Sequence, residues 1–385
     1  MLRVILLTAP IFVCLFWVII LADNPKSHSA PRSFFAKFMY LPVIIYFTHL
    51  LLYAPFPNIY YYFFDIVSAY TSLFVFPAYY VYFRLLTVDA EFSWKIHGKY
   101  FIPALTIATI YSIAILIAPE MEYKIWVFDN KANPSSAYVK FLSIGRTLVR
   151  LTYLIQVIVV LTSNFLLIKK YKDRAEQFYS DILDGKYNYA KRLNLSFLWM
   201  SLPAFILTAL GRFLIKQNEY SIYIGWPIFT VMLFIIGYLG YKLKPINPTF
   251  EASTNVEDAP QLNEITSAAQ QQILNKLEVE FKQNKVFLDN QLNIIDVAKA
   301  IGTNRTYISL IIKQNYNQNF CSYVNGFRVD ELKKVYAENP QYTNESLAQS
   351  CGFGSVNSMK RTVEAKTGMS ISDFKMSISG ADKSI

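Results

Sequence analysis

The sequence is poor in cysteine, in charge and in residues that break regular structure. Three cysteines occur among 385 residues, with no CxxC pair and no neighbouring histidine, so we expect neither a disulfide scaffold nor a zinc site. Charged residues make up 17%, where soluble domains carry about 25%. With 13 glycines, 16 prolines and an aromatic share of 16%, the chain is neither collagen-like nor disordered as a whole.

Motifs of enzymatic chemistry are also missing. The sequence contains no HExxH, no GxSxG, no paired acidic motif of an intramembrane hydrolase and no glycine-rich loop that cradles phosphate. An enzyme is therefore the least supported class of protein, and we expect no cofactor and no metal.

Apolar residues are abundant instead, at 54% against a usual value of about 45–50%. They gather in long runs before Pro245, and nothing comparable follows it. Runs close to the ~20 residues that cross a bilayer lie at 4–21, 38–53, 59–83, 101–118, 151–168, 195–215 and 222–241. Residues 1–244 are therefore predicted to form a seven-span transmembrane domain.

Lysine and arginine between these runs predict the orientation. With the N-terminus outside, the inner segments hold 15 Lys and Arg residues and the outer segments hold 8. Because cytoplasmic loops carry the excess, the sequence predicts a multi-pass protein of the bacterial inner membrane with an external N-terminus and a cytoplasmic C-terminal region.

A cleaved signal peptide over residues 1–22 is the alternative for the first run. The run is 18 residues long, which exceeds the 7–15 residues usual for the apolar part of a signal peptide. Cleavage would leave six spans and place the C-terminal region outside, against the distribution of basic residues.

Polar residues inside membrane spans often mark functional sites. The polar residues within the expected spans are His49, Asp65, Arg150 and Asn164, and the first three are the candidates for a site. Asp65 and Arg150 are both expected near the outer ends of their spans, where they would pair with each other or bind a charged ligand. A purely structural pair, or arginine reaching the interface, remains the alternative. Outer loops are too short for a folded sensor domain, so a signal would enter between helices or through a membrane partner protein.

Composition changes after Lys244. Residues 245–266 contain three prolines, four acidic residues and no basic residue, which is typical of a flexible tether. From about Ser267 apolar residues recur at steps of three and four, as in Ile273, Leu277 and Phe281, so a soluble helical domain is predicted to begin there.

The stretch 292–314 has the pattern of a helix-turn-helix. Val297, Ala298 and Ile301 supply the apolar face of one helix, and Gly302 permits the turn that ends it. Thr303 or Asn304 then caps a second helix whose apolar face includes Ile308 and Ile311. A small residue at the crossing and a glycine turn are what this motif requires.

Residues 343–366 repeat the plan. Asn344 or Thr343 caps the first helix, Gly352 forms the turn and Ser355 caps the second helix. The two turn glycines lie 50 residues apart. Between the units, roughly 319–338 is predicted to be one continuous helix that fixes their spacing. If that spacing is about 34 Å, both second helices can enter successive major grooves.

The doubled motif resembles the DNA-binding domain of the AraC/XylS family of bacterial transcription regulators. The family signature GFxSxSxFxRxFKxxxGxSPxxYR stands here as GFGSVNSMKRTVEAKTGMSISDFK. Matching positions are Gly352, Phe353, Ser355, Arg361, Gly368, Ser370 and Phe374; departures are Met359, Val363, Glu364, Ile371 and Lys375. Glu364 removes a positive charge where the family pattern implies a phosphate contact. Residues 267–376 are assigned to this domain, with 377–385 as a tail.

In a docked helix-turn-helix the exposed face of each second helix meets base edges, and basic residues hold phosphates. The residues expected at base edges are Thr306, Ser309, Asn357, Lys360 and Arg361. Those expected at phosphates are Arg305 and Lys313. A solvated helix face with no DNA contact is the alternative for each of them.

The overall prediction is an all-α, one-component signalling protein, with a seven-helix membrane bundle followed by an AraC-type domain. It would bind double-stranded DNA and regulate transcription from the membrane, like the membrane-anchored regulators of that family that it resembles. Expected partners are the bilayer, a small ligand or membrane partner protein, and RNA polymerase for an activator; a homodimer is left open. The alternative is a membrane receptor or transporter-like protein whose helix-turn-helix domain contacts proteins, because the net charge of 267–385 is only +3 (14 basic and 11 acidic residues).

Overall fold

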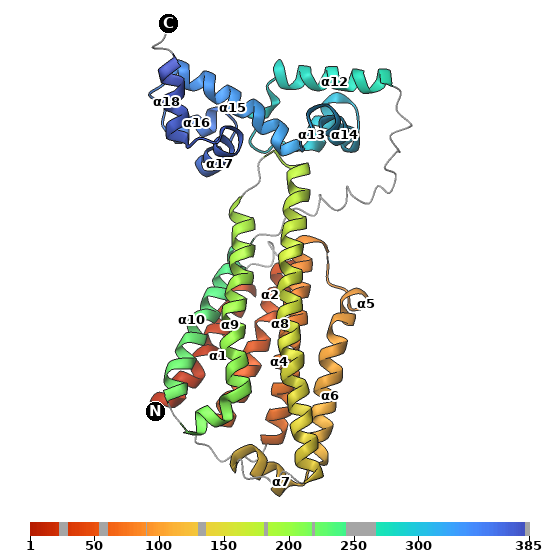
Figure 1. Cartoon of the computed structure of the whole chain (residues 1–385), viewed down its shortest axis with the longest axis vertical. Helices are drawn as coiled ribbons and strands as arrows, with labels where there is room; N and C mark the ends of the chain where they lie inside the picture. Colours follow the sequence, from red (N-terminus) through yellow and green to blue (C-terminus); the bar gives the residue numbers. More distant parts are fainter. Residues whose placement is uncertain are drawn as a thin grey trace. The chain divides into compact units, whose positions relative to one another are not determined.

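The computed structural model of the chain is helical (Figure 1). It describes residues 1–22, 30–53, 61–89, 91–129, 136–180, 184–217, 220–243 and 267–381. Within these ranges the one β-type contact is an isolated antiparallel bridge between Tyr179 and Asn293. The chain therefore belongs to the all-α class, as predicted. The expected tether, 245–266, lies outside the described residues.

Two compact units make up the chain. Unit 1 consists of Met1–Ile168 and Asn188–Pro248, and unit 2 consists of Lys169–Tyr187 and Thr249–Ile385. The helices of unit 1 are α1 (Leu2–Ala22), α2 (Ala30–Phe38), α3 (Tyr40–Tyr53), α4 (Tyr61–Thr87), α5 (Trp94–His97), η2 (Gly98–Phe101), α6 (Ile102–Ile117), α7 (Glu120–Lys124), η3 (Ile125–Asp129) and α10 (Tyr220–Lys242). Two long helices, α8 (Ala137–Phe178) and α9 (Asp184–Gln217), contribute residues to both units.

Six described helical stretches are long and apolar enough to cross a membrane. They are Leu2–Ala22, Ala30–Leu52, Tyr61–Thr87, Trp94–Ile117, Ala137–Phe178 and Ile222–Lys242. The count of seven spans is therefore not shown. The remaining expected span, 195–215, falls within α9, whose side chains beyond residue 206 lie outside the described part of the chain.

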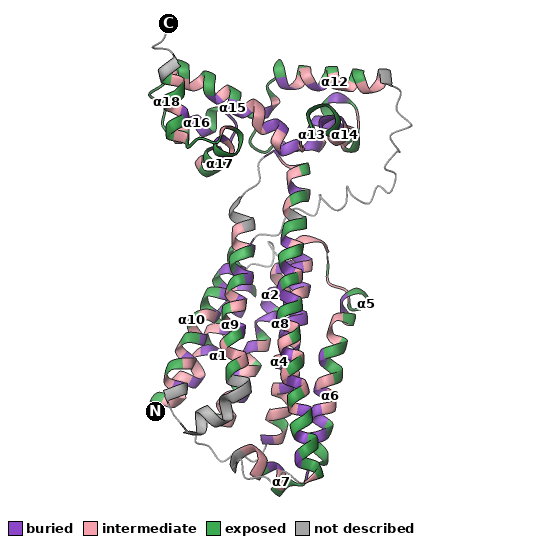
Figure 2. Cartoon of the chain, in the orientation of Figure 1, coloured by how far each residue is buried: buried purple, intermediate pink, exposed green. Residues whose placement is uncertain are grey.

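Helix α4 is the most enclosed of these stretches. In its most apolar part 61% of the residues are buried, compared with 28–39% in the others. The other helices are therefore exposed over much of their length (Figure 2). Their exposed large apolar side chains include Phe12, Ile155 and Val231. Such an outer surface suits acyl chains and is unusual on a soluble monomer.

A close contact joins α1 to α10. A Cβ atom added at Gly237 would lie 2.2 Å from the Trp17 ring, so only glycine lets the two helices approach this far. Small residues at helix contacts are typical of membrane bundles, where packing drives association.

The described residues of unit 2 form eight further named helices. They are α12 (Ser267–Lys282), η5 (Val286–Leu288), α13 (Ile294–Ile301), α14 (Arg305–Tyr316), α15 (Phe320–Glu338), α16 (Asn344–Ser350), α17 (Val356–Thr367) and α18 (Ile371–Ala381). Helix α15 lies between the pair α13–α14 and the pair α16–α17 (Figure 1). This is the predicted arrangement of two helix-turn-helices joined by a continuous helix.

Helix α15 contributes to two separate hydrophobic cores. Its first half places Phe320, Tyr323 and Val324 in a core with α12, α13 and α14. Its second half places Val329 and Leu332 in a core with α16, α17 and α18. One helix therefore holds two small globular halves together.

Candidate DNA-binding surface and polar clusters

The first helix-turn-helix is fixed by capping at each boundary. Asn293 and Asp296 form a capping box at the start of α13, and Gly302 ends this helix in the left-handed conformation at φ 79°. Asn304 then caps α14, because its side-chain oxygen accepts a bond from the Tyr307 amide at 3.0 Å. Of the two capping residues expected there, the structure selects Asn304.

The second helix-turn-helix has the same kinds of helix cap and glycine turn. Thr343 caps α16 by accepting from the Ser346 amide at 3.2 Å, and Ser355 caps α17 by accepting from the Ser358 amide at 3.1 Å. Gly352 adopts φ 76°, and a Cβ there would lie 2.5 Å from the Phe287 carbonyl oxygen. The turn of the second helix-turn-helix therefore lies directly against the backbone of η5, which belongs to the first half of the domain.

The linker helix separates the two helix-turn-helices. Helix α15 contains 19 residues, which corresponds to about 28 Å of α-helix. Its first half belongs to the core of the first helix-turn-helix and its second half to the core of the second.

The residues expected at base edges lie on α14 and α17. Four of the five are exposed and Ser309 is half-buried; the exposed ones are Thr306, Asn357, Lys360 and Arg361. The inward faces of the same helices are closed, since Ile308, Met359 and Val363 are all 0% exposed. The polar faces of both second helices are thus presented at the surface.

The two residues expected to contact phosphates, Arg305 and Lys313, differ in their exposure to solvent. Lys313 is exposed, whereas Arg305 is half-buried at the start of α14, and burial lowers the pKa of its guanidinium. Glu364 is exposed on α17, so the acidic departure from the family signature stands on the surface.

Basic residues concentrate on the two second helices. Together α14 and α17 carry five basic residues and one acidic residue. The rest of 267–385 carries nine basic and ten acidic residues, because the totals are 14 and 11. The modest charge of the domain is therefore focused where DNA would bind.

Arg328 of α15 lies between the two halves of the domain and is 0% exposed. Its guanidinium donates to the carbonyl oxygens of Phe287 and Asp289, each at 2.8 Å. It also donates to the carbonyl and hydroxyl oxygens of Ser180, each at 3.0 Å. Arginine is usually exposed, whereas this arginine is buried and bonds to four oxygen atoms of the surrounding chain.

Ser180 comes from the segment that follows α8, and it is fully enclosed in unit 2. Its amide donates to the Leu292 carbonyl at 3.0 Å, and its carbonyl also accepts from the Cys321 thiol at 3.4 Å. The neighbouring Tyr179 forms the antiparallel bridge to Asn293.

The last turn of α8 also packs against unit 2, in the core of the first helix-turn-helix. Phe178 is 4% exposed and belongs to the core of the first helix-turn-helix. The Glu176 carboxylate accepts a hydrogen bond from the side-chain amide of Asn319 at 3.2 Å. The end of α8 is therefore a structural part of unit 2. We call residues 176–180 the α8 tail.

In unit 1, Asp65 is the centre of a polar cluster. It accepts bonds from the hydroxyls of Tyr111 at 2.9 Å and Tyr123 at 2.5 Å, and it pairs with Arg146 at 3.5 Å. Arg146 also stacks over the Trp126 ring at 3.7 Å. Arg146, which lies one helical turn before Arg150 on α8, is thus an ion partner of Asp65.

Arg150 and His49 line a cavity of about 590 Å³ in unit 1, beside Asp65 and Arg146. His49 packs edge-on against the rings of Tyr46 and Trp226. The structure therefore brings Asp65, Arg150 and His49 to one cavity, whereas Asn164 donates a bond to the Asn194 side-chain oxygen at 3.3 Å.

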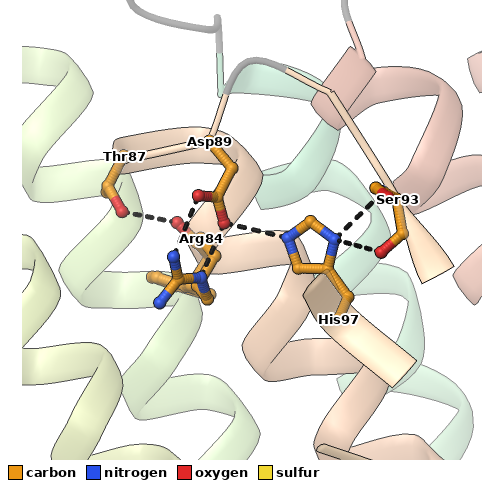
Figure 3. Close-up of polar contacts among 6 residues, drawn as sticks. Arg84, Thr87, Asp89, Ser93 and His97 are labelled. Atoms are coloured by element: carbon orange, nitrogen blue, oxygen red, sulfur yellow. Dashed lines mark hydrogen bonds and ion pairs between the residues drawn. The ribbon is translucent and has the colours of Figure 1, made fainter. Parts of the chain in front are cut away.

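A second polar cluster follows α4 (Figure 3). Asp89 accepts from Arg84 Nε at 2.6 Å and contacts His97 Nε2 at 2.9 Å, while the Ser93 amide lies 3.1 Å from His97 Nδ1. Burial raises the pKa of Asp89, but the bonds from Arg84 and His97 outweigh burial, and the pKa is lowered. This cluster closes the turn between α4 and α5.

Sequence patterns missed Arg146, Tyr111, Asp89, His97 and the α8 tail. Periodicity and spacing report neighbours along a helix, and these contacts join different helices. The signal that could have pointed to the α8 tail is the pair of aromatic residues Phe178 and Tyr179 within a segment rich in charged residues. Among the described residues no group of three or more His, Cys, Asp and Glu side chains is placed to hold a metal ion.

Residues 297–377 match a protein-family model described as a helix-turn-helix domain. The match runs from α13 to α18 and contains both second helices. No curated protein and no solved structure matches the chain. The chain therefore has a C-terminal AraC-type helix-turn-helix domain, as the resemblance indicated, after an N-terminal region with six candidate membrane spans.

Proposed function

We propose that this protein is a membrane-bound, sequence-specific transcription regulator, in which the membrane unit controls the DNA-binding unit through α8. The helix-turn-helix domain implies DNA binding, and the six candidate spans imply the bilayer as the second partner. The excess of basic residues in the predicted inner loops supports a cytoplasmic C-terminal domain in the bacterial inner membrane.

The observation that carries this proposal is the place of the α8 tail. A membrane anchor needs only a tether, whereas Phe178 and Ser180 are buried among residues of the first helix-turn-helix. The same helix contains the candidate span Ala137–Phe178. A change in α8 within the membrane would therefore reach the DNA-binding core without an intermediate loop.

Each second helix has a proposed role in reading DNA. In α17, Arg361 would bond guanine through O6 and N7, and Asn357 would bond adenine through N6 and N7. In α14, Thr306 and Ser309 would meet base edges while Arg305 and Lys313 hold phosphates. Lys360 would face the groove beside Arg361.

Regulation would depend on two states of the membrane unit that place the α8 tail differently. A signal shifts such an equilibrium only by binding the two states with different affinity. A small ligand in the unit 1 cavity is the proposed signal, and RNA polymerase is the proposed partner of an activating state.

A selection from random DNA duplexes tests the DNA-binding part. The full chain in lipid nanodiscs should enrich two half-sites spaced by about one helical turn, at about 50 mM salt. Affinity should fall roughly 10³–10⁵-fold at about 200 mM salt if 6–10 phosphates are contacted. Recovery of no enriched sequence would reject a specific regulator and favour a helix-turn-helix domain that contacts proteins.

A further inference from the structure

We propose that the cavity in unit 1 binds an uncharged lipophilic molecule, with a hydroxyl or carbonyl head near Asp65 and Ser68 and a single apolar chain in the rest of the cavity. This names the class of the small ligand in the proposed function and rests on that function only for its effect on DNA.

The cavity is elongated. Asp65 and Phe76 both line it from α4, and the helix between them extends for about 16 Å. On α10 the lining runs from Trp226 to Ile236, which spans about 15 Å. The volume of about 590 Å³ lies within the roughly 300–1,000 Å³ of small-molecule sites. A single chain fits this shape better than a compact solute does.

Asp65 and Arg146 mark the polar end of the cavity. Their side chains lie 3.5 Å apart. The Tyr111 hydroxyl donates to Asp65 at 2.9 Å and accepts from Arg146 at 2.9 Å. Arg146 also stacks over the Trp126 ring at 3.7 Å. These two charges therefore stabilise each other within the protein.

The other charged residues of the described lining, Arg3 and Arg150, also interact with groups of the protein. A charged head would have to displace one of these contacts or lie in the bundle without a counter-charge, and both are costly. A hydroxyl or carbonyl head makes no such demand. It can exchange hydrogen bonds with Ser68, which lines the cavity about one turn after Asp65.

Polar groups deeper in the cavity bond to the backbone. The hydroxyls of Ser72 and Ser201 donate to the carbonyl oxygens of Ala69 at 3.1 Å and Phe197 at 2.7 Å. The Tyr153 hydroxyl donates to the Ser201 carbonyl at 3.3 Å. Because these hydroxyl protons are used within the protein, this part of the lining favours apolar atoms of a ligand.

Buried apolar side chains enclose the same part. The Phe76 ring packs edge-on against the rings of Tyr153 and Phe197, with centroids 4.8 Å and 5.9 Å away. Leu233 and Ile236 line the cavity from α10 and are 2% and 1% exposed. A wall of aromatic and aliphatic groups suits an apolar chain.

The test uses the full chain in nanodiscs of phosphatidylcholine. The probes are dodecanol, dodecanoate and dodecyltrimethylammonium, and each affinity is referred to the concentration of the probe in the bilayer. We expect dodecanol to bind at least about tenfold more tightly than either charged probe, because a charged head is costly to bury without a counter-charge.

Tryptophan fluorescence reports the place of binding. A dodecanol brominated on its chain should quench Trp226, which lines the cavity and is 2% exposed. Trp226→Phe should remove the saturable part of the quenching. Trp199→Phe is the matched control, since Trp199 is 61% exposed and is not among the described lining residues. It should leave the saturable part intact.

Variants of α10 change the volume of the cavity. Leu233→Phe should weaken dodecanol binding roughly tenfold or more, because the larger ring takes up space in the site. Val231→Phe is the matched control, since Val231 lies on the same helix and is 57% exposed. Leu233→Ala enlarges the cavity and should bind hexadecanol more tightly than the wild type does.

Charged probes that bind as tightly as dodecanol would overturn the proposal, as would unchanged affinities in both Leu233 variants. Monooleoylglycerol in the disc distinguishes two sources of the ligand: competition with dodecanol assigns the site to an uncharged bilayer lipid, and no competition assigns it to a free molecule. Both results support an uncharged ligand. Dodecanol binding with no change in DNA affinity would support the site and reject the sensing role in the proposed function.

Discussion

Arg361 is the residue through which base recognition is most directly testable. It is exposed on α17, on the side opposite the buried Met359 and Val363. Arg361→Ala should weaken binding to the selected site by roughly 1–3 kcal/mol and relax preference at one base pair. The measurement is fluorescence anisotropy with a panel of single-base variants of the site.

Lys334→Ala is the control for this experiment, because Lys334 is an exposed basic residue of the linker helix α15 and belongs to neither second helix. It should leave base preference intact. A uniform loss of affinity over all sequences with Arg361→Ala would instead assign Arg361 to a phosphate.

Asp89 makes the membrane unit sensitive to acid. Its pKa is lowered in the folded protein, since the bonds from Arg84 and His97 outweigh burial. A lowered folded pKa stabilises the fold above the unfolded pKa of about 3.9, and this stabilisation is lost as pH falls through the folded pKa. The thermal unfolding midpoint should therefore drop on acidification from about pH 5 to pH 3.

The Asp89→Asn variant should be less stable at pH 7 and should show a shallower drop over that range, by nanodisc differential scanning fluorimetry. Glu91→Gln, at an exposed position two residues away, serves as the comparison. An unchanged acid profile in Asp89→Asn would contradict a stabilising role for this carboxylate.

At the scale of helices, the α8 tail is the element whose role the sequence did not reveal. Phe178→Ala should destabilise unit 2 by about 3–5 kcal/mol, because it removes a 4%-exposed aromatic ring from a closed core. Hydrogen exchange of α13 and α14 reports the loss, since both helices share that core.

Gln177→Ala is the matched control, because Gln177 neighbours Phe178 on α8 and is exposed. It should change exchange rates little. Equal protection of α13 and α14 in Phe178→Ala and Gln177→Ala would mean that the tail does not support the domain.

The helix boundaries of the two helix-turn-helices could be predicted from the sequence because helix capping depends on residues close together in the chain. Asn304, Ser355 and Gly302 act on their own helix ends, and capping needs only the next few residues. Arg328 shows the limit of such signals. A charged side chain is usually exposed, whereas Arg328 is buried and donates to the carbonyl oxygens of Phe287 and Ser180, which lie far away in sequence.

The membrane candidates show the same limit. His49, Asp65 and Arg150 stood out as polar residues in apolar runs, and the structure gathers them at one cavity. Sequence spacing could not single out Arg146 as an ion partner of Asp65, because Arg146 and Arg150 lie on nearly the same face of α8 one turn apart. Helix packing brings Arg146 to 3.5 Å from Asp65.

At the scale of the whole molecule, the continuity of α8 is the property to test. Helix α8 runs unbroken from Ala137 to Phe178, and residues 169–178 belong to unit 2. Replacing the exposed pair Lys169 and Lys170 by glycine lowers helix propensity by about 1 kcal/mol at each position. DNA affinity should then become independent of the state of the membrane.

The state of the membrane can be changed by using nanodiscs of thin and of thick bilayers, because hydrophobic mismatch alters the tilt and packing of membrane spans. Wild-type DNA affinity should differ between the discs, within the roughly 5–150-fold typical of allosteric coupling, and the double-glycine variant should show no difference. The Lys169→Ala, Lys170→Ala variant keeps the helix and should retain the response. Equal responses in the two variants would exclude α8 as the route.

The buried α8 tail also determines how the protein must be made. Phe178 and Ser180 are synthesised before α9 and α10, yet their partners Leu292 and Arg328 leave the ribosome only after those helices. Because domains generally fold as units during synthesis, the first helix-turn-helix would complete its core only once the polypeptide that follows α10 returns to the tail. A protease that cut the chain between residues 245 and 266 would free a fragment without Phe178 and Ser180, so release from the membrane would yield an incomplete domain.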